Sequence, residues 1–216
     1  RFNWLGQIMP AFGNYGISIV DVYSGYNTPI DLKIDSTSHI YLAGDYSSYG
    51  EFFVARLGLE GALDAGFGDG GIVQTGIRSV VGTLALGTQD GGKVVVASRE
   101  SLTNNFYLCR FDTQGQPDVD FGLAGVTRLG IDHLEAPVTM TVCPDDKILL
   151  ASQNLDLGIS GAFVARFTAD GWLDLAGLLP GRAYSSIANY SSKVAMTPLP
   201  GGGMLQGSVY VCNRKF

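Results

Sequence analysis

The chain has 216 residues, of which 46% are hydrophobic and 16% charged, a composition typical of globular rather than disordered proteins. A net charge of −6 and the lack of a Lys/Arg-rich run argue against nucleic acid or anionic membranes as partners. No apolar run approaches the roughly 20 residues that a membrane span needs. The 30 glycines, about twice ordinary usage, indicate many tight turns, as in an all-β protein.

One motif recurs four times along the chain. An Arg is followed by an apolar residue, and Gly comes five residues after the Arg. Three copies have Asp eight residues after the Arg, with Met9 as the exception, and three have Phe-Gly at positions eleven and twelve, with Gly177-Leu178 as the exception. The motifs begin at Arg1, Arg56, Arg110 and Arg166, which are 55, 54 and 56 residues apart. This regular spacing predicts a repeat protein.

Each repeat is predicted to contain four short strands, which we call a, b, c and d. In the second repeat they are LAL at 84–86, KVVVAS at 93–98, FYLCRF at 106–111 and GVTRL at 125–129. Strand b is continuously apolar, which predicts burial on both faces. A sandwich or a lipocalin-type barrel would leave one face in water and show alternation. The pattern therefore predicts four-stranded sheets packed face to face around an axis, as in a β-propeller.

We expect residues 1–216 to form a single propeller domain of four blades, each with four antiparallel strands. The chain begins at the end of a strand c, continues through a strand d at 16–20, and ends with a strand c at 209–212. The N-terminal strand is therefore expected to join the C-terminal blade and close the ring, which removes exposed sheet edges. The alternative is a larger ring, completed by another copy or by further sequence. The expected state is a monomer or a ring-completing homo-oligomer.

The residues also show a family resemblance. The segment FVARLGLEGALDAGFGDGGIV at 53–73, followed by LALGTQDGGKVVVAS at 84–98, resembles the delta-60 repeat of bacterial proteins. The likeness covers nearly the whole chain and is clearest in the second and third repeats. It implies propeller blades and a secreted or surface-associated binding protein. It carries over no catalytic residue.

Two faces of the predicted disc differ in sequence. The a–b and c–d turns share one face, the corner face, where Asp64, Asp118 and Asp174 are expected to bind their own backbone in Asx turns. The b–c and d–a loops share the other, the loop face, and are non-repeating and rich in Tyr, Ser, Asn and Asp. Such loops suit sugar hydroxyls or a protein epitope. The candidate ligand-binding residues are Tyr23, Tyr26, Tyr46, Tyr49, Arg99, Asp132, His133, Glu135, Tyr184 and Tyr190.

The sequence favours a non-enzymatic binding module for a carbohydrate or protein ligand. A glycan-active hydrolase is the first alternative, because two facing carboxylates are sufficient for that chemistry. A purely structural propeller within a larger surface assembly is the second. The carboxylates available to a hydrolase on the loop face are Asp45, Glu100, Asp132, Glu135 and Asp156.

No cofactor or metal is expected. The segment 68–71 is not a phosphate-binding loop because no helix follows it, and no GxSxG motif is present. Asp132, His133 and Glu135 are interpreted as a solvated charged loop. The cysteines Cys109, Cys143 and Cys212 lie in apolar runs without CxxC spacing and are expected to be buried free thiols.

Overall fold

The computed structural model describes residues 1–22, 27–46, 50–101, 103, 105–130, 134–154, 161–175, 182–186, 194–195 and 210–211. Throughout this part of the chain the regular structure is β-strand, as predicted.

Three antiparallel sheets contain four strands each, in chain order. The first is β1 (Thr28–Ile34), β2 (Ile40–Asp45), β3 (Glu51–Leu57) and β4 (Ile72–Arg78). The second is β5 (Ala85–Gln89), β6 (Lys93–Arg99), β7 (Phe106–Phe111) and β8 (Val126–Leu129). The third is β9 (Leu134–Val142), β10 (Ile148–Asn154), β11 (Gly161–Phe167) and β12 (Arg182–Ser186).

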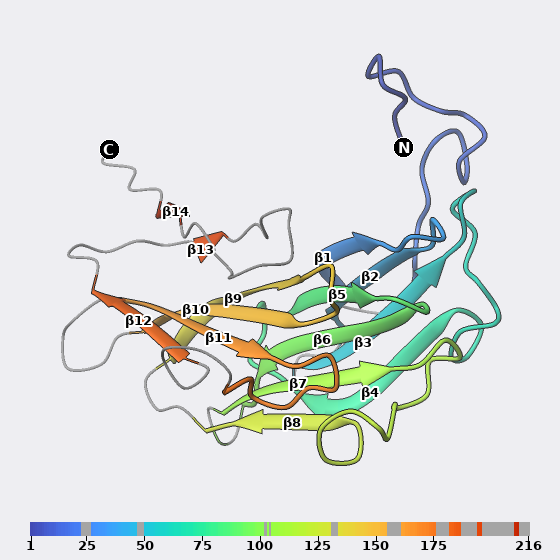
Figure 1. Ribbon diagram of the computed structural model, residues 1–216. Coiled ribbons are helices and arrows are strands. Elements are labelled where there is room, and N and C mark those ends of the chain that lie inside the picture. Colours follow the sequence, from blue (N-terminus) through green and yellow to red (C-terminus); the bar gives the residue numbers. More distant parts are fainter. Residues whose placement is uncertain are drawn as a thin grey trace.

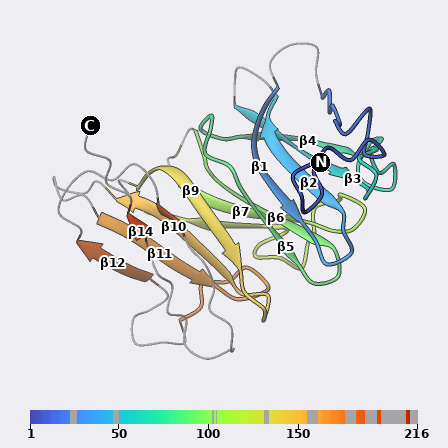
Figure 2. The ribbon, with the colours of Figure 1, turned by 90° about the horizontal axis from the view of Figure 1, so that it is seen from above.

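The sheets stand side by side in chain order, as Figures 1 and 2 show. The first strands of successive sheets lie together, β1 against β5 and β5 against β9, while the fourth strand of each sheet forms an outer edge. This is how blades are arranged in a β-propeller. The described residues contain no helix of the length and apolarity that crossing a membrane requires.

The continuously apolar strand b is buried on both faces, as predicted. In β6, Val94 and Val96 belong to the core between the first two sheets. Val95 and Ala97 belong to the core between the second and third sheets. All four side chains are fully buried. Because successive side chains of a strand point to opposite faces, only an unbroken apolar run fills both cores.

The N-terminal segment, residues 1–20, differs from the prediction. We expected a strand at 16–20, but this segment forms only the isolated bridges Phe2–Ile8 and Asn14–Ile17. Ile17 and Ile19 remain exposed because no described strand pairs with them. Closure of the ring by the N-terminal strand is therefore not seen in the described residues.

One face of the first sheet is apolar and open. Leu32 in β1 and Leu86 in β5 occupy equivalent positions, because Leu32 pairs with Leu42 and Leu86 pairs with Val96. Leu86 is fully buried between two sheets, whereas Leu32 is 52% exposed. A groove of about 630 Å³ runs along this open face. The N-terminal segment contributes Arg1, Phe12, Ser18 and Val20 to its lining.

The fourth repeat also departs from the expected strand order. A two-stranded sheet pairs β13 (Val194–Ala195) directly with β14 (Tyr210–Val211). We predicted a strand b at 203–207 between them, and those residues lie outside the described part. Four glycines between 201 and 207 weaken the β-propensity of that stretch. Four complete blades are thus not seen, although β13 packs against β9 and β10 as the next blade should.

The thiols behave as predicted where they are described. Cys109 and Cys143 are free and buried. Burial raises the pKa of the Cys109 thiol to about 12, so the thiolate that reacts with oxidants or metals is suppressed at neutral pH. Cys212 lies outside the described residues.

Candidate functional site

The predicted loop face is only partly described. Tyr46 and Arg99 have described side chains, whereas Glu135 and Tyr184 are placed only by their positions in β9 and β12. The other six candidates lie outside the described residues: Tyr23, Tyr26, Tyr49, Asp132, His133 and Tyr190.

The loop end of the first sheet carries hydrogen-bonding groups. The backbone N–H of Tyr46 donates to the carbonyl oxygen of Glu51 at 3.0 Å. Burial and the neighbouring Glu51 carboxylate raise the pKa of the Tyr46 hydroxyl, so the phenol stays neutral. The Glu51 Oε1 atom lies 4.0 Å from Nε of Arg78. Tyr46 thus offers an aromatic surface beside the Glu51 carboxylate, which in turn lies near the Arg78 guanidinium.

A second polar group lies at the loop end of the second sheet. The Glu100 carboxylate accepts a hydrogen bond from the Thr103 hydroxyl and lies 3.6 Å from a guanidinium nitrogen of Arg128. Arg99, the residue before Glu100, is partly buried. The described loop face therefore presents paired charges that suit recognition of polar ligands.

Asp45 has a structural role on this face. Its side chain sits at the end of β2 and the residue is 4% exposed. Its Oδ2 accepts the backbone N–H of Gly82 at 2.9 Å, and its Oδ1 lies 3.4 Å from the Ser79 hydroxyl. Burial raises the pKa of this carboxyl group, against the lowering effect of those two hydrogen bonds. Asp45 thus holds the loop between the first two sheets and is not presented to a substrate.

The corner face carries an ion pair in each of three repeats, between the repeated Arg and the Asp eight residues later. The Nε–Oδ2 distances are 2.8 Å for Arg56–Asp64, 2.9 Å for Arg110–Asp118 and 2.8 Å for Arg166–Asp174. The predicted Asx turns are confirmed for the first two carboxylates, whose Oδ1 atoms accept N–H groups two residues on. The ion pairs were not predicted from the sequence, although the constant spacing of Arg and Asp was their signal.

The arginines that open the first three motifs connect neighbouring repeats. In each case NH1 donates to a backbone carbonyl of the next repeat: Arg1 to Leu59 at 2.8 Å, Arg56 to Thr113 at 2.6 Å and Arg110 to Ala169 at 2.8 Å. The Gly of each Phe-Gly pair donates its N–H beside that contact: Gly13 to Glu60, Gly68 to Gln114 and Gly122 to Asp170. We call this set of contacts the inter-repeat latch. The N-terminal segment therefore docks on the first sheet as each sheet docks on the next.

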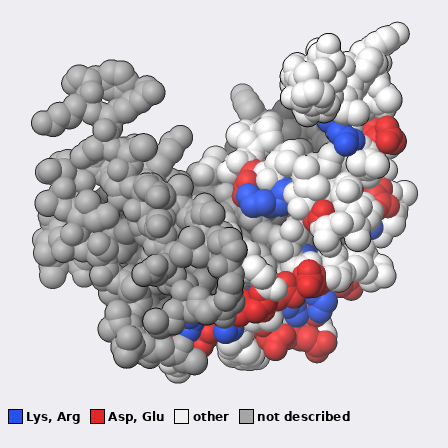
Figure 3. Space-filling model, turned by 45° about the horizontal axis from the view of Figure 1, so that its top comes forward, with Lys and Arg blue, Asp and Glu red and all other residues white. Residues whose placement is uncertain are grey.

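A third side chain, a Lys or a His, completes each corner. Lys93 Nζ lies 2.8 Å from Asp118 Oδ2, and Lys147 Nζ lies 3.7 Å from Asp174 Oδ2. The equivalent residue of the first sheet is His39, whose Nε2 lies 3.6 Å from Asp64 Oδ2. Acids and bases alternate along one side of the molecule in Figure 3, as expected for paired charges. The described residues contain no cluster of three potential metal ligands.

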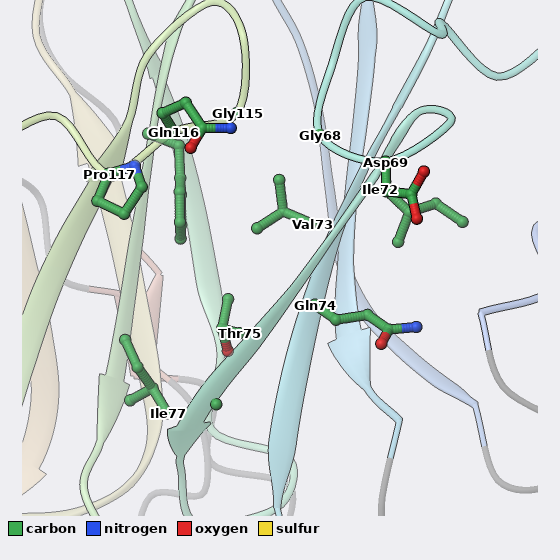
Figure 4. Close-up of a pocket in the computed structure, with 12 residues that line it drawn as sticks. Gly68, Asp69, Ile72, Val73, Gln74, Thr75, Ile77, Gly115, Gln116 and Pro117 are labelled. Carbon is green, nitrogen blue, oxygen red and sulfur yellow. The ribbon is translucent and has the colours of Figure 1, made fainter.

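A groove of about 850 Å³ lies between the first two sheets (Figure 4). The whole of β4 up to Ile77 forms one wall, together with the preceding corner residues Gly68 and Asp69. Phe111 and the turn at 115–117 form the other wall. In Figure 4, Val73, Thr75 and Ile77 project toward the side of Pro117, and Gln74 projects away. The sequence analysis did not identify this groove, because its two walls belong to different repeats.

A comparison with protein families gives one partial match. A family described as a domain of unknown function (DUF5122) beta-propeller matches residues 36–67. This stretch contains β2, β3 and the corner with Asp64 and Phe67. No curated protein matches the chain. The match covers 32 of the 216 residues and, with the three meander sheets, supports a propeller-like repeat fold.

Proposed function

We propose that the protein is a non-enzymatic binding module that presents its loop face to a carbohydrate or protein ligand. The supporting observation is the contrast between the two faces. On the corner face, the charged side chains repeat in register and bind their own scaffold. On the loop face, Tyr46, Arg78 and Arg128 do not recur in equivalent positions; Tyr46 is partly buried, and the side chains of Arg78 and Arg128 are 53% and 58% exposed. Non-repeating polar groups on a rigid scaffold are typical of ligand recognition.

The hydrolase alternative finds less support. Five carboxylates on the loop face were candidates for the two catalytic groups of a hydrolase. Of these, Asp45 is buried and holds a loop, and the Glu100 carboxylate contacts the Thr103 hydroxyl and the Arg128 guanidinium. The side chains of Asp132, Glu135 and Asp156 lie outside the described part. We therefore place the enzyme second to the binding module.

Binding is tested by screening the protein on an array of bacterial and host glycans and against immobilised surface proteins of candidate host cells. Tyr46→Ala is expected to weaken any interaction found, because it removes the described aromatic group of the loop face. Tyr15→Ala is the matched control, since Tyr15 is 80% exposed on the N-terminal segment. Equal binding by both variants and the parent protein would exclude the loop end of the first sheet as the site.

We further propose that the blades are delta-60-type repeats and that the chain completes a ring of four blades. In this ring the N-terminal segment would supply the outer strand of the C-terminal blade. Two observations support it: the N-terminal segment already uses the inter-repeat latch, and the apolar face around Leu32 lacks a covering sheet. A secreted or cell-surface location follows from the same resemblance and remains part of the proposal.

A further inference from the structure

The groove lies between the first two sheets, and the contact between these sheets differs from the equivalent contacts on either side. Those are the contact between the N-terminal segment and the first sheet and the contact between the second and third sheets. Ser18 and Thr127 each donate a side-chain hydroxyl to a glycine carbonyl of the next repeat, Gly61 and Gly171. The equivalent residue of the first sheet is Val73, which has no hydroxyl. Its methyl groups lie against Gly115 instead, where an added Cβ would be 2.7 Å from Val73 Cγ2. The wall of this junction is therefore apolar where the others are hydrogen-bonded.

The strand that forms the wall has an open backbone edge. β4 is the last strand of its sheet, so alternate residues turn their N–H and C=O groups away from β3. The N–H of Arg56 bonds to the carbonyl of Gly71, and the ladder continues through Val54–Val73. By the alternation of an antiparallel ladder, the outward groups then belong to Ile72 and Gln74. The register shifts between the Phe53–Gln74 and Glu51–Arg78 pairs, and Gly76 lies in that irregular part of the strand.

One end of this edge is occupied by the turn that precedes β4. Asp69 N–H donates to the Ile72 carbonyl at 2.8 Å, and Ile72 N–H donates to the Asp69 carbonyl at 3.1 Å. The same two-residue turn recurs at Asn14–Ile17 and Leu123–Val126. Beyond the turn, Gln74 and Gly76 are exposed and line the groove. A Cβ added at Gly76 would have open space around it.

The lining favours one class of ligand. Its aromatic residue, Phe111, is only 4% exposed, so the groove offers no ring face on which a sugar can stack. Val73, Thr75 and Ile77 lie at alternate positions along one side, the spacing at which side chains of an extended chain recur, and Val73 and Ile77 provide its apolar contacts. Asp69 is the charged residue of the lining. These features fit an extended peptide with apolar residues at alternate positions and a basic group at one end.

We propose that this groove binds such a peptide as an added antiparallel strand on β4. The peptide backbone pairs with Gln74, the outward position beyond the Asp69–Ile72 turn. Its apolar side chains pack on Val73 and Ile77, and its basic residue lies beside the Asp69 carboxylate. The site is separate from the loop face and stands whether or not the loop face binds a ligand.

The test uses two labelled ten-residue peptides in which Leu alternates with Thr, one ending in Arg and the other in Glu. Fluorescence anisotropy with the full chain is expected to show tighter binding of the Arg peptide, by about two- to fivefold, with the preference fading at high salt. Asp69→Asn should abolish the preference. Asp120→Asn is the matched control, because it removes one exposed carboxylate outside the groove.

Hydrogen exchange distinguishes strand addition from other binding. Bound peptide should slow exchange of the Gln74 amide, because its N–H group gains a backbone partner. Ile77→Thr should weaken binding of both peptides, and an unchanged Tm would show that the fold is intact. The proposal is overturned if neither peptide binds, if Asp69→Asn leaves the Arg preference in place, or if this amide exchanges at the same rate with and without peptide.

Discussion

Arg110 donates a hydrogen bond from NH1 to the carbonyl oxygen of Ala169, 2.8 Å away in the following repeat. The same side chain places Nε 2.9 Å from Asp118 in its own repeat, and its guanidinium lies 4.7 Å from the centre of the Phe121 ring. One side chain therefore fixes a corner and also attaches the next sheet to it. Arg56 follows the same plan, whereas the first latch has Met9 at the position of the Asp. Stability should therefore propagate between neighbouring repeats, as in other repeat proteins.

Replacing Asp118 by Ala should lower the free energy of unfolding by about 3 kcal/mol, because it leaves a buried guanidinium without its carboxylate. Asp118 and Arg110 have side chains that are 9% and 4% exposed. Urea unfolding monitored by circular dichroism measures the loss. Asp120→Ala is the control, since Asp120 lies two residues on and is exposed, and it should change stability by less than about 0.5 kcal/mol. Similar losses in both variants would contradict a special role for the ion pair.

Acid should weaken the fold through the corner carboxylates. Burial acts to raise the pKa of Asp118, but hydrogen bonds from Lys93 and the Asp120 backbone and the charge of Arg110 lower it below its ordinary value. The pKa of Asp64 is lowered too, mainly by the Gly66 N–H. A carboxyl group whose pKa is lower when folded stabilises the protein above its unfolded pKa, near 4, and loses that contribution as the pH falls further.

Unfolding midpoints measured between pH 7 and pH 2.5 should therefore stay nearly level to about pH 4 as far as these groups contribute, and then fall. Asp118→Asn should reduce the steepness of the fall, because the residue then has no proton to bind. An unchanged acid profile in this variant would assign the pH dependence to other groups.

The fold was largely predictable because its determinants are local and repeated. The unbroken apolar run at Val94–Ala97 required burial on two faces, and the spacing of Arg56 and Asp64 recurred in later repeats. What the sequence did not show depends on neighbours across repeats. Val73 lies opposite Gly115 only once two sheets are packed, so the groove was not foreseen. The exposure of Ile17 and Ile19 was also missed, since the apolar pattern of a strand does not specify whether a partner lies beside it.

His39 occupies the position that Lys93 and Lys147 occupy in the second and third sheets. Replacing His39 by Lys should therefore stabilise the protein. His39→Lys places at the first corner the cationic residue found at Lys93 and Lys147, within reach of the Asp64 carboxylate. The expected gain is about 0.5 kcal/mol, the usual size for a partly exposed ion pair. Thermal unfolding of both proteins at pH 8 tests this, and a loss of stability would show that the imidazole makes a contact that Lys cannot replace.

Leu32→Asp tests whether the open face of the first sheet is covered in solution. If the ring closes, Asp at this position is buried without a partner and should destabilise the protein by roughly 2 kcal/mol or more. Leu123→Asp is the control, because Leu123 is 80% exposed at the corner of the second sheet. Equal, small effects would indicate that the face is in water. Light scattering on the parent protein then separates closure within one chain, expected near 22.9 kDa, from closure between two copies.

Gly171 lies where the fourth motif meets the corner of the second sheet. Its φ is +82°, and an added Cβ would lie 2.4 Å from Cζ of Phe121. Gly91 has a similar φ of +76° but open space around it, so Gly91→Ala should cost only the backbone strain, about 1 kcal/mol. Gly171→Ala should cost clearly more, about 3 kcal/mol in total, because the Phe121 ring is fully buried and has no room to move. Chemical unfolding of the two variants isolates the contact as the difference between them. Equal losses would mean that the Phe121 side chain can shift at little cost in free energy. The hydrogen bonds of the latch, rather than the packing of Phe121 against Gly171, would then hold these two repeats together.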